Sequence, residues 1–494
     1  MAAGLQYNNM ERISNWINGT EVEPNSKRFL SKINPDTEEV LWQFIDSDEV
    51  DVKKAVDTAY KAFESWKVTT AIQRGDYLNE FVSKMIEFRE ELIECNALET
   101  GKSLKDSSGE FEAAIKQGMY WVGEGMRLYS NSLTSADINK FSTTIKVPHG
   151  VCGLIVPANT ALANICWKIF PALLCGNTAI LKASEDAPKL ALLIGRISKK
   201  SNLPNGVLNI LQGSGRNSGE LLINDPRVKL ISFTGSTSTG KHIANVASNY
   251  LTRISLELGG KNPFMVCNDA NIDLSIHWAI LSAFSNAGQR CAAASRIIVM
   301  DKIYDEFKQK FIDKARNLTL GIDSTSDLGP VINARQKESI LNNINYAISQ
   351  GGKLLTGQDN FKNKRKGYYV YPTIIEDIKE QNFLVDTEIF GPVAILQKAR
   401  NFEHLINLGN SSKYGLTAAI HTKDINMAMS AAKLIQAGTF NINFGTFGSE
   451  AHMPFGGLGE SGNGTREPGV EAINVYTELK NVSIKIDDKL AHEE

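Results

Sequence analysis

The chain has 494 residues, of which 42% are hydrophobic and 22% are charged, and its formal net charge is -2. This length exceeds what one hydrophobic core usually serves, so it predicts two or three domains. The nearly balanced charge speaks against nucleic acid as a partner, and no apolar run approaches the ~20 residues needed to cross a bilayer.

The cysteines and histidines are scattered and show no metal-ligand or C-x-x-C spacing. The six cysteines are Cys95, Cys152, Cys166, Cys175, Cys267 and Cys291. This pattern is not typical of a disulfide scaffold or a zinc site, and the polar residues 1–13 contain no signal-peptide core. We therefore expect a cytoplasmic protein with no bound metal, no nucleic-acid partner and no membrane association.

The first part of the chain reads as small β-structure followed by helices. Residues 13–45 mix short apolar runs with turn signals such as Asn18-Gly19. Helical spacing of apolar residues then predicts helices over 52–66, 75–98 and 109–126.

From residue 150 onward, apolar strand-like runs alternate with helical runs. Strands are predicted at 151–156, 179–182, 207–211, 230–233 and 254–258, with helices near 161–174, 187–200, 217–224 and 237–249. This alternation predicts an α/β fold with a parallel, doubly wound sheet.

A second α/β region is predicted after residue 260. Its strands are expected at 263–266, 297–300, 393–397, 418–421 and 439–443. The polar residues 356–367 predict a surface loop, residues 472–486 a strand, and residues 487–494 a solvated tail.

Polar or glycine-rich residues stand where the predicted strands of the first sheet end, which is where such sheets bind ligands. They are Pro157-Ala158-Asn159, Lys182 with Glu185, Gly213-Ser214-Gly215, Thr234-Gly235-Ser236-Thr237, and Glu257. Lys182 and Glu185 are placed to contact the hydroxyls of an adenine ribose, where a carboxylate would repel a 2′-phosphate and favour NAD over NADP. A surface ion pair is the alternative.

The glycine-rich turn around Gly235 and Ser236 precedes a predicted helix, whose free N–H groups suit a pyrophosphate. An ordinary capped turn fits the same residues, because the G-x-G-x-x-G fingerprint is absent. Asn159 is a candidate oxyanion donor or a turn former. In the second region, Glu388 and Phe390 are candidates for contacts with a nicotinamide ribose and ring, or for a plain loop.

Glu257 and Cys291 are the candidates for acid–base and nucleophilic chemistry. Glu257 ends an apolar strand, where desolvation raises the pKa of a carboxyl group as a general base requires; a carboxylate that caps the next turn is the alternative. Cys291 lies among small residues in Asn286-Ala287-Gly288-Gln289-Arg290-Cys291-Ala292-Ala293. A cysteine attacks only as its thiolate, so this role needs a lowered pKa or a nearby base; a buried inert thiol is the alternative.

An ordered set of motifs resembles the aldehyde dehydrogenase superfamily, in its hydrolytic, non-phosphorylating branch. The resemblance covers residues 13–485 and rests on LKASE (181–185), FTGSTSTG (233–240), LELGGKNP (256–263), GQRC (288–291), EIFGPV (388–393), NIN (441–443) and PFGG (454–457). It implies a Rossmann-type cofactor domain at 1–125 and 149–259, an α/β catalytic domain at 260–448, and a small β bridging element at 126–148 and 472–494. It also implies a homodimer or homotetramer.

The resemblance implies a role for each matching residue. Cys291 is the nucleophile, Glu257 the base that activates the deacylating water, Asn159 the side chain of the oxyanion hole, and Glu467 a weaker match to a second, proton-relaying carboxylate. The implied contacts of an NAD cofactor, with NADP also possible, are Val156, Pro157, Lys182, Ser184, Glu185, Gly215, Phe233, Gly235, Ser236, Leu258, Gly259, Glu388 and Phe390. The implied reaction converts an aldehyde to a carboxylate through a thiohemiacetal, hydride transfer to nicotinamide and a thioester.

The chain departs from the family pattern near the substrate. Ala158 and Thr160, on either side of Asn159, stand where the family usually has aromatic residues, and Ala163 and Asn164 follow, while Trp167 remains. Gly459 stands two residues after PFGG, where the family usually has a lysine. A roomier, more polar tunnel is therefore expected.

The motifs GQRCAAAS and GEGMR (123–127) are most similar to the subgroup that acts on semialdehydes of oxo- or dicarboxylic acids, such as α-ketoglutaric semialdehyde. Arg127 or Arg290 would then bind the distal carboxylate, or both arginines are structural. Other interpretations are oxidation of apolar or aromatic aldehydes, a cofactor-independent thioesterase or esterase, a non-catalytic protein with this fold, and a coenzyme-A-acylating dehydrogenase.

Overall fold

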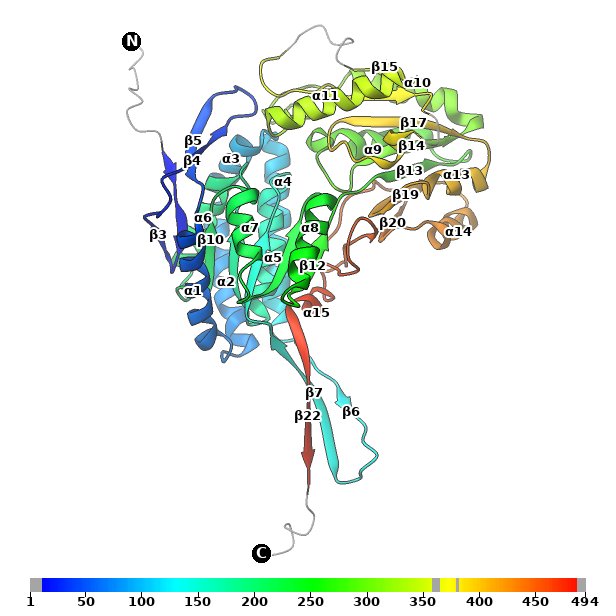
Figure 1. Cartoon of the computed structure of the whole chain (residues 1–494). Helices are drawn as coiled ribbons and strands as arrows, with labels where there is room; N and C mark the ends of the chain where they lie inside the picture. Colours follow the sequence, from blue (N-terminus) through cyan, green and yellow to red (C-terminus); the bar gives the residue numbers. More distant parts are fainter. Residues whose placement is uncertain (1–10, 358–364, 379–381, 487–494) are drawn as a thin grey trace, which may run out of the picture.

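The computed structural model describes residues 11–357, 365–378 and 382–486 (Figure 1). Two seven-stranded sheets, each with helices around it, form the two main parts of the molecule, and a narrow three-stranded sheet projects from one of them. The predictions for residues 1–10, for 358–364 within the polar loop and for the tail at 487–494 lie outside the described residues.

The first sheet has the strand order β12-β11-β8-β9-β10-β2-β3. Its strands are β2 Asn15–Ile17, β3 Thr20–Val22, β8 Val151–Ile155, β9 Thr178–Lys182, β10 Leu208–Leu211, β11 Val228–Thr234 and β12 Arg253–Glu257. The five strands from β8 to β12 run parallel, as predicted, whereas β2 and β3 add an antiparallel edge that the sequence did not reveal.

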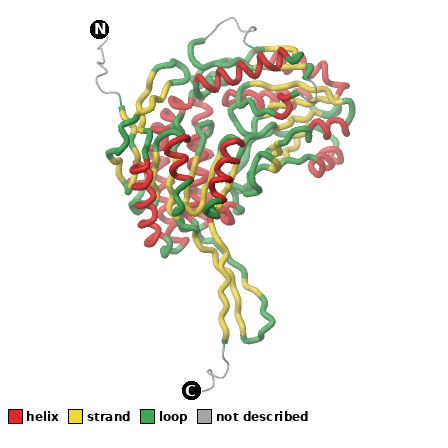
Figure 2. The backbone as a smooth tube through the Cα atoms, in the orientation of Figure 1, coloured by secondary structure: helices red, strands yellow, loops and turns green. Residues whose placement is uncertain are grey.

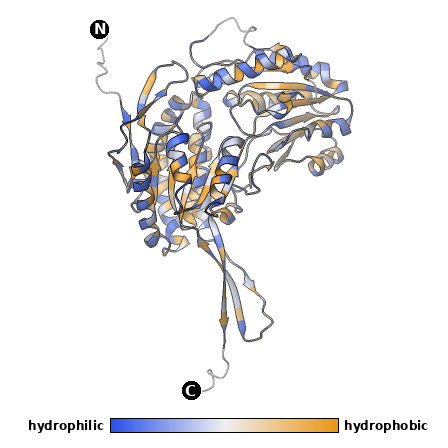
Figure 3. Ribbon diagram, viewed as in Figure 1, coloured by the Kyte–Doolittle hydropathy of each residue, from blue (hydrophilic) through white to orange (hydrophobic). Residues whose placement is uncertain are grey.

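Helices cover both faces of this sheet, because its strands are apolar on both sides. In β9, Ala179 and Leu181 face one core and Ile180 faces the other. The core of Ile180 includes α1 Glu49–Trp66, α7 Glu220–Ile223 and α8 Thr237–Ser248. The opposite core includes α2 Ala71–Glu87, α3 Arg89–Thr100, α4 Leu104–Glu124, α5 Ala161–Leu174 and α6 Pro188–Lys200. In Figure 3 the strands of this part are largely hydrophobic, and hydrophilic residues lie on the outer helices.

The second sheet has the order β15-β16-β17-β14-β13-β19-β20, parallel except for β15 at its edge. Its strands are β13 Asn262–Val266, β14 Ala294–Met300, β15 Lys353–Thr356, β16 Thr373–Glu376, β17 Val393–Ala399, β19 Thr417–His421 and β20 Thr439–Ile442. The surrounding helices are α9 Ile272–Phe284, α10 Tyr304–Arg316, α11 Ala334–Ser349, α12 Phe383–Asp386, α13 Phe402–Gly409 and α14 Ile425–Leu434. The five predicted strands are confirmed, and β15 and β16 were not predicted.

The remaining strands form smaller sheets. The projecting sheet pairs β22 Thr477–Lys485 with β7 Lys140–Pro148 along nine residue pairs, and β6 Ser132–Leu133 lies at its other edge (Figure 2). Near the N-terminus, β1 Arg12–Ile13, β5 Val40–Ile45 and β4 Phe29–Ile33 form a sheet, and β18 Tyr414–Gly415 pairs with β21 Leu458–Gly459. The predicted small β-structure at 13–45 is thus confirmed.

Three expected elements are wrong in part. The single helix expected at 75–98 is two helices, because the backbone leaves the helical conformation at Phe88 (φ -95°, ψ 22°). The strand expected at 472–486 begins only at Thr477, since α15 Ala472–Tyr476 precedes it with Ala472, Ile473, Val475 and Tyr476 buried at helical spacing. The helix expected at 217–224 starts as a π-helical turn at 215–219 and is regular only in α7.

Candidate active site

Cys291 lies in the turn that leads into β14, and the polypeptide around this turn is tightly held. Nδ2 of Asn262, the first residue of β13, donates to the carbonyl oxygens of Cys291 (2.7 Å) and Ala293 (2.9 Å). A Cβ atom at Gly260 would stand 2.5 Å from the Cys291 carbonyl oxygen, so the close approach requires glycine. Cys291 is partly exposed, while the other five cysteines are buried.

The surroundings of Cys291 raise the pKa of its thiol to about 12, first through burial and then through the carboxylates of Glu388 and Glu257. A nucleophilic thiolate needs a lowered pKa, and these surroundings do not provide one. They do provide two carboxylates near the thiol. The structure thus brings Cys291, Glu257 and Glu388 together.

Glu257 ends β12 as a buried carboxylate, 4% exposed, and neither oxygen has a hydrogen-bond partner among the described residues. Burial raises its pKa well above the ordinary value, the charge of Glu467 raises it further, and Lys168 and Arg466 oppose the shift. This is the direction expected from the sequence. A Cβ atom at Gly456 would lie 2.9 Å from Oε1 of Glu257, so glycine leaves the carboxylate room.

Asn159 follows β8 and reaches the same turn as Cys291. Its Nδ2 donates to the carbonyl oxygen of Gln289 at 2.9 Å. A side-chain amide carries two N–H groups, so one remains for another acceptor beside the nucleophile.

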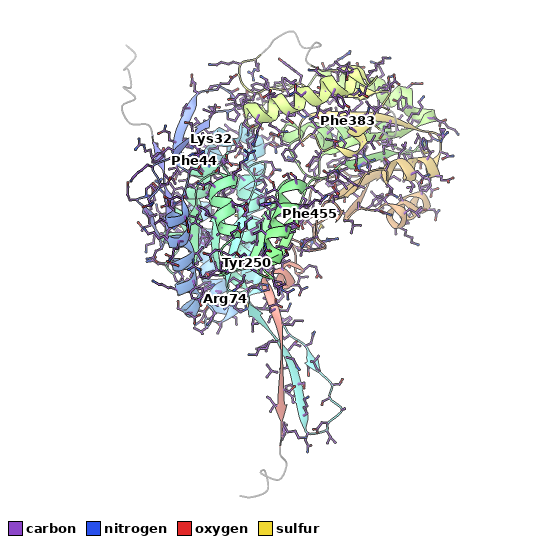
Figure 4. The ribbon with its side chains drawn as sticks, in the orientation of Figure 1. Lys32, Phe44, Arg74, Tyr250, Phe383 and Phe455 are labelled. Atoms are coloured by element: carbon purple, nitrogen blue, oxygen red, sulfur yellow. The ribbon has the colours of Figure 1, made fainter. Side chains whose placement is uncertain are left out.

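The segment after Asn159 carries the polar substitutions noted in the sequence. Thr160 precedes α5, and Nδ2 of Asn164 donates to its Oγ1 at 2.8 Å, so the two polar side chains partly satisfy each other. Trp167 packs edge-to-face on Phe455, with ring centroids 5.6 Å apart. Figure 4 labels Phe455 near the junction of the two main parts of the molecule.

The two candidate arginines have different surroundings. The Arg127 side chain is 51% exposed and pairs with Glu124 through Nε (2.9 Å) and Nη2 (2.8 Å). The Arg290 guanidinium lies over the ring of Phe447, 4.7 Å from its centroid, and 3.9 Å from Asp106.

Glu467 is buried in a polar cluster. Its carboxylate accepts hydrogen bonds from Lys168 (3.0 Å), Ser232 (2.9 Å) and Tyr476 (3.2 Å). Lys168 was missed in the sequence, although it is the lone charged residue of the apolar helix α5 and charged side chains are rarely buried without a function or a partner.

The residues expected at the adenine ribose meet at adjacent strand ends. Lys182 ends β9 and is buried, which lowers its pKa to about 8, and its Nζ donates to the Ala183 carbonyl. Glu185 is exposed and accepts from the backbone N–H of Gly215 at 2.9 Å, whereas the Ser184 hydroxyl accepts from the N–H of Asp186.

The expected pyrophosphate turn lies at the N-terminus of α8. Ser236 is the N-cap and accepts from the N–H of Thr239, and the other N–H groups of the first helical turn have no intrahelical partner. A Cβ atom at Gly235 would lie 2.5 Å from the Phe233 ring. Val156 and Leu258 are buried near the ends of β8 and β12, and Pro157 is half-buried.

Glu388 and Phe390 line a small pocket together with Gly288 and Arg290 of the Cys291 turn. Oε1 of Glu388 accepts from the Gly260 N–H at 3.1 Å, and a Cβ atom at Gly259 would lie 2.2 Å from Oε2. Burial raises the pKa of Glu388 to about 7. Gln336 donates to the Phe390 carbonyl, and Gly260 also lines this pocket.

Within the described residues, no group of three or more histidine, cysteine, aspartate or glutamate side chains is arranged to hold a metal ion. No described helix is long and apolar enough to cross a membrane.

Comparison with known proteins identifies the family. The aldehyde dehydrogenase family model matches residues 22–482. Retinaldehyde dehydrogenase 3 of Rattus norvegicus is 37% identical over 96% of this chain and 93% of its own length, and alpha-ketoglutaric semialdehyde dehydrogenase of Bacillus subtilis is 35% identical over 95% and 98%. The crystal structure of betaine aldehyde dehydrogenase from Staphylococcus aureus in complex with NAD+ superposes with a TM-score of 0.93, at 32% identity over 96% of this chain and 95% of that one. The motifs, the fold and these relatives agree along nearly the whole length, and the chain therefore belongs to the aldehyde dehydrogenase family.

Proposed function

We propose that the protein oxidises an aldehyde to a carboxylate with NAD, using Cys291 as the nucleophile. The observation that carries the proposal is that three other segments of the chain meet at the Cys291 turn. The Cys291 turn is contacted by Asn159 through Gln289, and the carboxylates of Glu257 and Glu388 both act on the Cys291 thiol.

The glycines, the helix N-terminus and the strand ends near the site fit a bound dinucleotide. Gly259 and Gly235 occupy positions where a Cβ atom would collide with Glu388 and Phe233, so the backbone is kept open beside these side chains. The α8 N-terminus offers free N–H groups and a favourable dipole for phosphate, and Lys182 and Glu185 lie at neighbouring strand ends for ribose hydroxyls. Bound NAD supplies an acceptor for the hydride that leaves the substrate carbon.

The residues of the chain account for the other steps. The Cys291 thiol first releases its proton to water; the thiolate sulfur then forms a bond to the aldehyde carbon as the carbonyl π bond opens, and the resulting oxyanion is stabilised by the free N–H of Asn159. Loss of hydride from that carbon leaves a thioester on Cys291. Glu257 in its carboxylate form removes a proton from water, which adds to the thioester carbon; the carbon–sulfur bond breaks and the acid is released.

The high pKa of Cys291 in the protein alone agrees with this order. A thiol with a pKa of about 12 is almost wholly protonated near neutrality and unreactive toward chance electrophiles. The positive charge of the oxidised nicotinamide would favour the thiolate, so we expect the reactivity of Cys291 to rise when NAD binds.

The substrate class we propose is a semialdehyde with a distal carboxylate, bound by Arg290. The alpha-ketoglutaric semialdehyde dehydrogenase among the relatives supports this class. Arg127 already pairs with Glu124, whereas no hydrogen bond from the Arg290 guanidinium is found in the described parts of the chain. An arginine free to donate is the preferred partner of a carboxylate.

Glu185 favours NAD over NADP, since its carboxylate lies by the ribose-binding strand end and would repel a 2′-phosphate. We further propose that the protein is a homo-oligomer. The projecting sheet exposes Phe141 (49%), Leu479 (64%) and Ile484 (53%), an apolar surface that a second copy would cover. The division into a cofactor domain, a catalytic domain and a bridging element also remains a proposal.

The first experiment follows reduction of NAD and NADP by absorbance, with a panel of α-ketoglutaric semialdehyde, succinic semialdehyde, betaine aldehyde, hexanal and benzaldehyde. Cys291→Ala is the control. NADH formation that is abolished in Cys291→Ala, with free acid released in the absence of coenzyme A, would support the dehydrogenase. Preference for hexanal or benzaldehyde would discard the semialdehyde class alone. Ester hydrolysis without NAD, and no reduction of either cofactor, would instead favour the esterase alternative.

A further inference from the structure

Two buried side chains with no role assigned so far hold the peptide carbonyl of Asn159. Nζ of Lys102 and Nδ2 of Asn286 each donate to this oxygen at 2.9 Å. A carbonyl oxygen has two lone pairs, so both of its acceptor positions are used. The peptide group that carries the Asn159 side chain is therefore fixed from two directions.

Lys102 is itself held by a buried counter-ion. It pairs with Oε2 of Glu110, and the two side chains are 2% and 5% exposed. Oε1 of Glu110 accepts from the backbone N–H groups of Leu162 (2.7 Å) and Ala163 (3.2 Å) at the start of α5. Thr160 makes no capping hydrogen bond there, so Glu110 caps the helix in its place.

Asn286 lies in a conformation that side-chain-bearing residues rarely adopt. Its φ is 52°, that of Ala287 is 52°, and that of Gly288 is 67°. Only glycine fits at the third position, because a Cβ atom there would stand 2.2 Å from the Gly391 carbonyl oxygen. This left-handed segment leads directly into Gln289, whose carbonyl receives the Asn159 amide. Asn286 thus ties the strand end that carries Asn159 to the turn that carries Cys291.

We propose that Lys102 and Asn286 are positioning residues for the oxyanion donor. By fixing the Asn159 peptide, they keep one hydrogen of its amide on Gln289 and direct the other toward the oxygen of the substrate. An oxyanion donor is effective only when it is oriented before the reaction begins. A buried ion pair such as Lys102–Glu110 adds little stability over apolar residues of the same size, which argues for a role in geometry. The inference rests on the function proposed above.

The decisive experiment is a double-mutant cycle between Asn286→Gly and Asn159→Ala. Glycine accepts the left-handed backbone at position 286, so only the amide is lost. Removing an oxyanion donor lowers the rate by roughly 100- to 1,000-fold, and misplacing it through Asn286→Gly should lower kcat/KM by roughly 10-fold with an unchanged Kd for NAD. In the Asn159→Ala background, Asn286→Gly should have no further effect on kcat/KM, because the group it positions is absent.

A second variant tests the other contact. Lys102→Met with Glu110→Gln removes the ion pair without leaving one charge buried alone. This double variant should lower kcat/KM when Asn159 is present and should have no further effect in the Asn159→Ala background. If it does not fold, the cycle with Asn286→Gly alone tests the inference.

Asn209→Ala is the matched control. Asn209 is fully buried in β10 and its Nδ2 donates to the Gly206 carbonyl, so the variant should lose thermal stability while kcat/KM stays near that of the wild type. The inference would be overturned if the losses of kcat/KM caused by Asn286→Gly and Asn159→Ala multiplied in the double variant. It would also be overturned if Asn286→Gly weakened NAD binding as much as it lowered kcat/KM, since Asn286 would then have only a structural role. If the wild type oxidises no aldehyde, the proposed function has failed first, which separates the two results.

Discussion

Nζ of Lys168 lies 3.0 Å from Oε2 of Glu467, and both side chains are only 1% exposed. The hydroxyl of Ser232 joins the pair, since it accepts from Lys168 at 2.6 Å and donates to Oε1 of Glu467 at 2.9 Å. The two charges act in opposite directions on the pKa of Glu257, which Glu467 raises and Lys168 lowers. Burial is the main cause of the raised pKa of Glu257, and this fixed ion pair adjusts the proton affinity of the proposed general base further.

This arrangement predicts opposite effects of two substitutions on the pH profile. Glu257 acts as a base only when it is deprotonated, so thioester hydrolysis is lost as the pH falls through its pKa. Glu467→Gln removes a negative charge and lowers the pKa of Glu257, so the acidic limb should move to lower pH. Lys168→Met should move it to higher pH. Single-turnover measurement of acid release against pH checks both, with Lys308→Met as a control that removes a partly buried lysine bound to Glu376. If the acidic limb of the pH profile did not move in either variant, Lys168 and Glu467 would not control the pKa of Glu257.

NAD affinity should be greatest between about pH 7 and about pH 8. Burial raises the pKa of Glu388 to about 7, and below it the carboxyl is protonated and loses its capacity as a charged acceptor for ribose hydroxyls. Burial lowers the pKa of Lys182 to about 8, and above it the ammonium loses its charge. Titration of intrinsic fluorescence with NAD, repeated from well below pH 7 to well above pH 8, measures the Kd. Glu388→Gln should abolish the loss at low pH, and Lys182→Met the loss at high pH.

Each of these two variants should also weaken binding by about 10-fold or more at neutral pH, since a hydrogen bond to a charged group contributes ~1.5–3 kcal/mol. A wild-type Kd that stays constant from well below pH 7 to well above pH 8 would argue against both contacts.

Arg290→Met should separate anionic from neutral aldehydes. The loss of a charge-assisted contact should lower kcat/KM for succinic semialdehyde by roughly 10- to 100-fold, and it should leave butanal, of equal length, within about two-fold. Betaine aldehyde should improve as a substrate, because its cation no longer meets the guanidinium. Arg127→Met is the matched control and should change none of the three, as Arg127 is exposed and paired with Glu124. Equal effects on the two chain-matched aldehydes would remove Arg290 from substrate recognition.

Gly459 should not tolerate the lysine that is common at this position in the family. Its φ is 57°, and a Cβ atom would lie 2.5 Å from the Lys413 carbonyl oxygen, where β21 pairs with β18. The left-handed backbone alone destabilises a side-chain-bearing residue by ~1–2 kcal/mol, and the contact adds to this. Gly459→Ala should therefore lower the Tm by more than Gly351→Ala, whose φ is 94° but whose Cβ would meet nothing within 4 Å. Equal Tm values for the two variants would show that the close contact is relieved.

Local patterns along the chain are enough to predict much of the fold. The five parallel strands from β8 to β12 are apolar on both faces and alternate with helices, so their order along the chain fixed a doubly wound sheet. The strand ends then marked Asn159, Lys182 and Glu257 as site candidates. That β2 joins this sheet beside β10 was not predicted, because the two strands lie far apart in the sequence. The break at Phe88 and the helix before β22 were also missed, although the buried residues of that helix have helical spacing.

How the candidate residues act on one another depends on the packed molecule. Nothing in the local sequence shows that burial and two carboxylates raise the pKa of Cys291, since those groups come from three different parts of the chain. The roles proposed for Lys102 and Asn286 likewise depend on contacts between the segment before α4, the segment after β8 and the turn before Cys291. A residue type and its spacing determine which chemistry is available, whereas pKa and orientation depend on distance and desolvation, which are properties of the packed molecule.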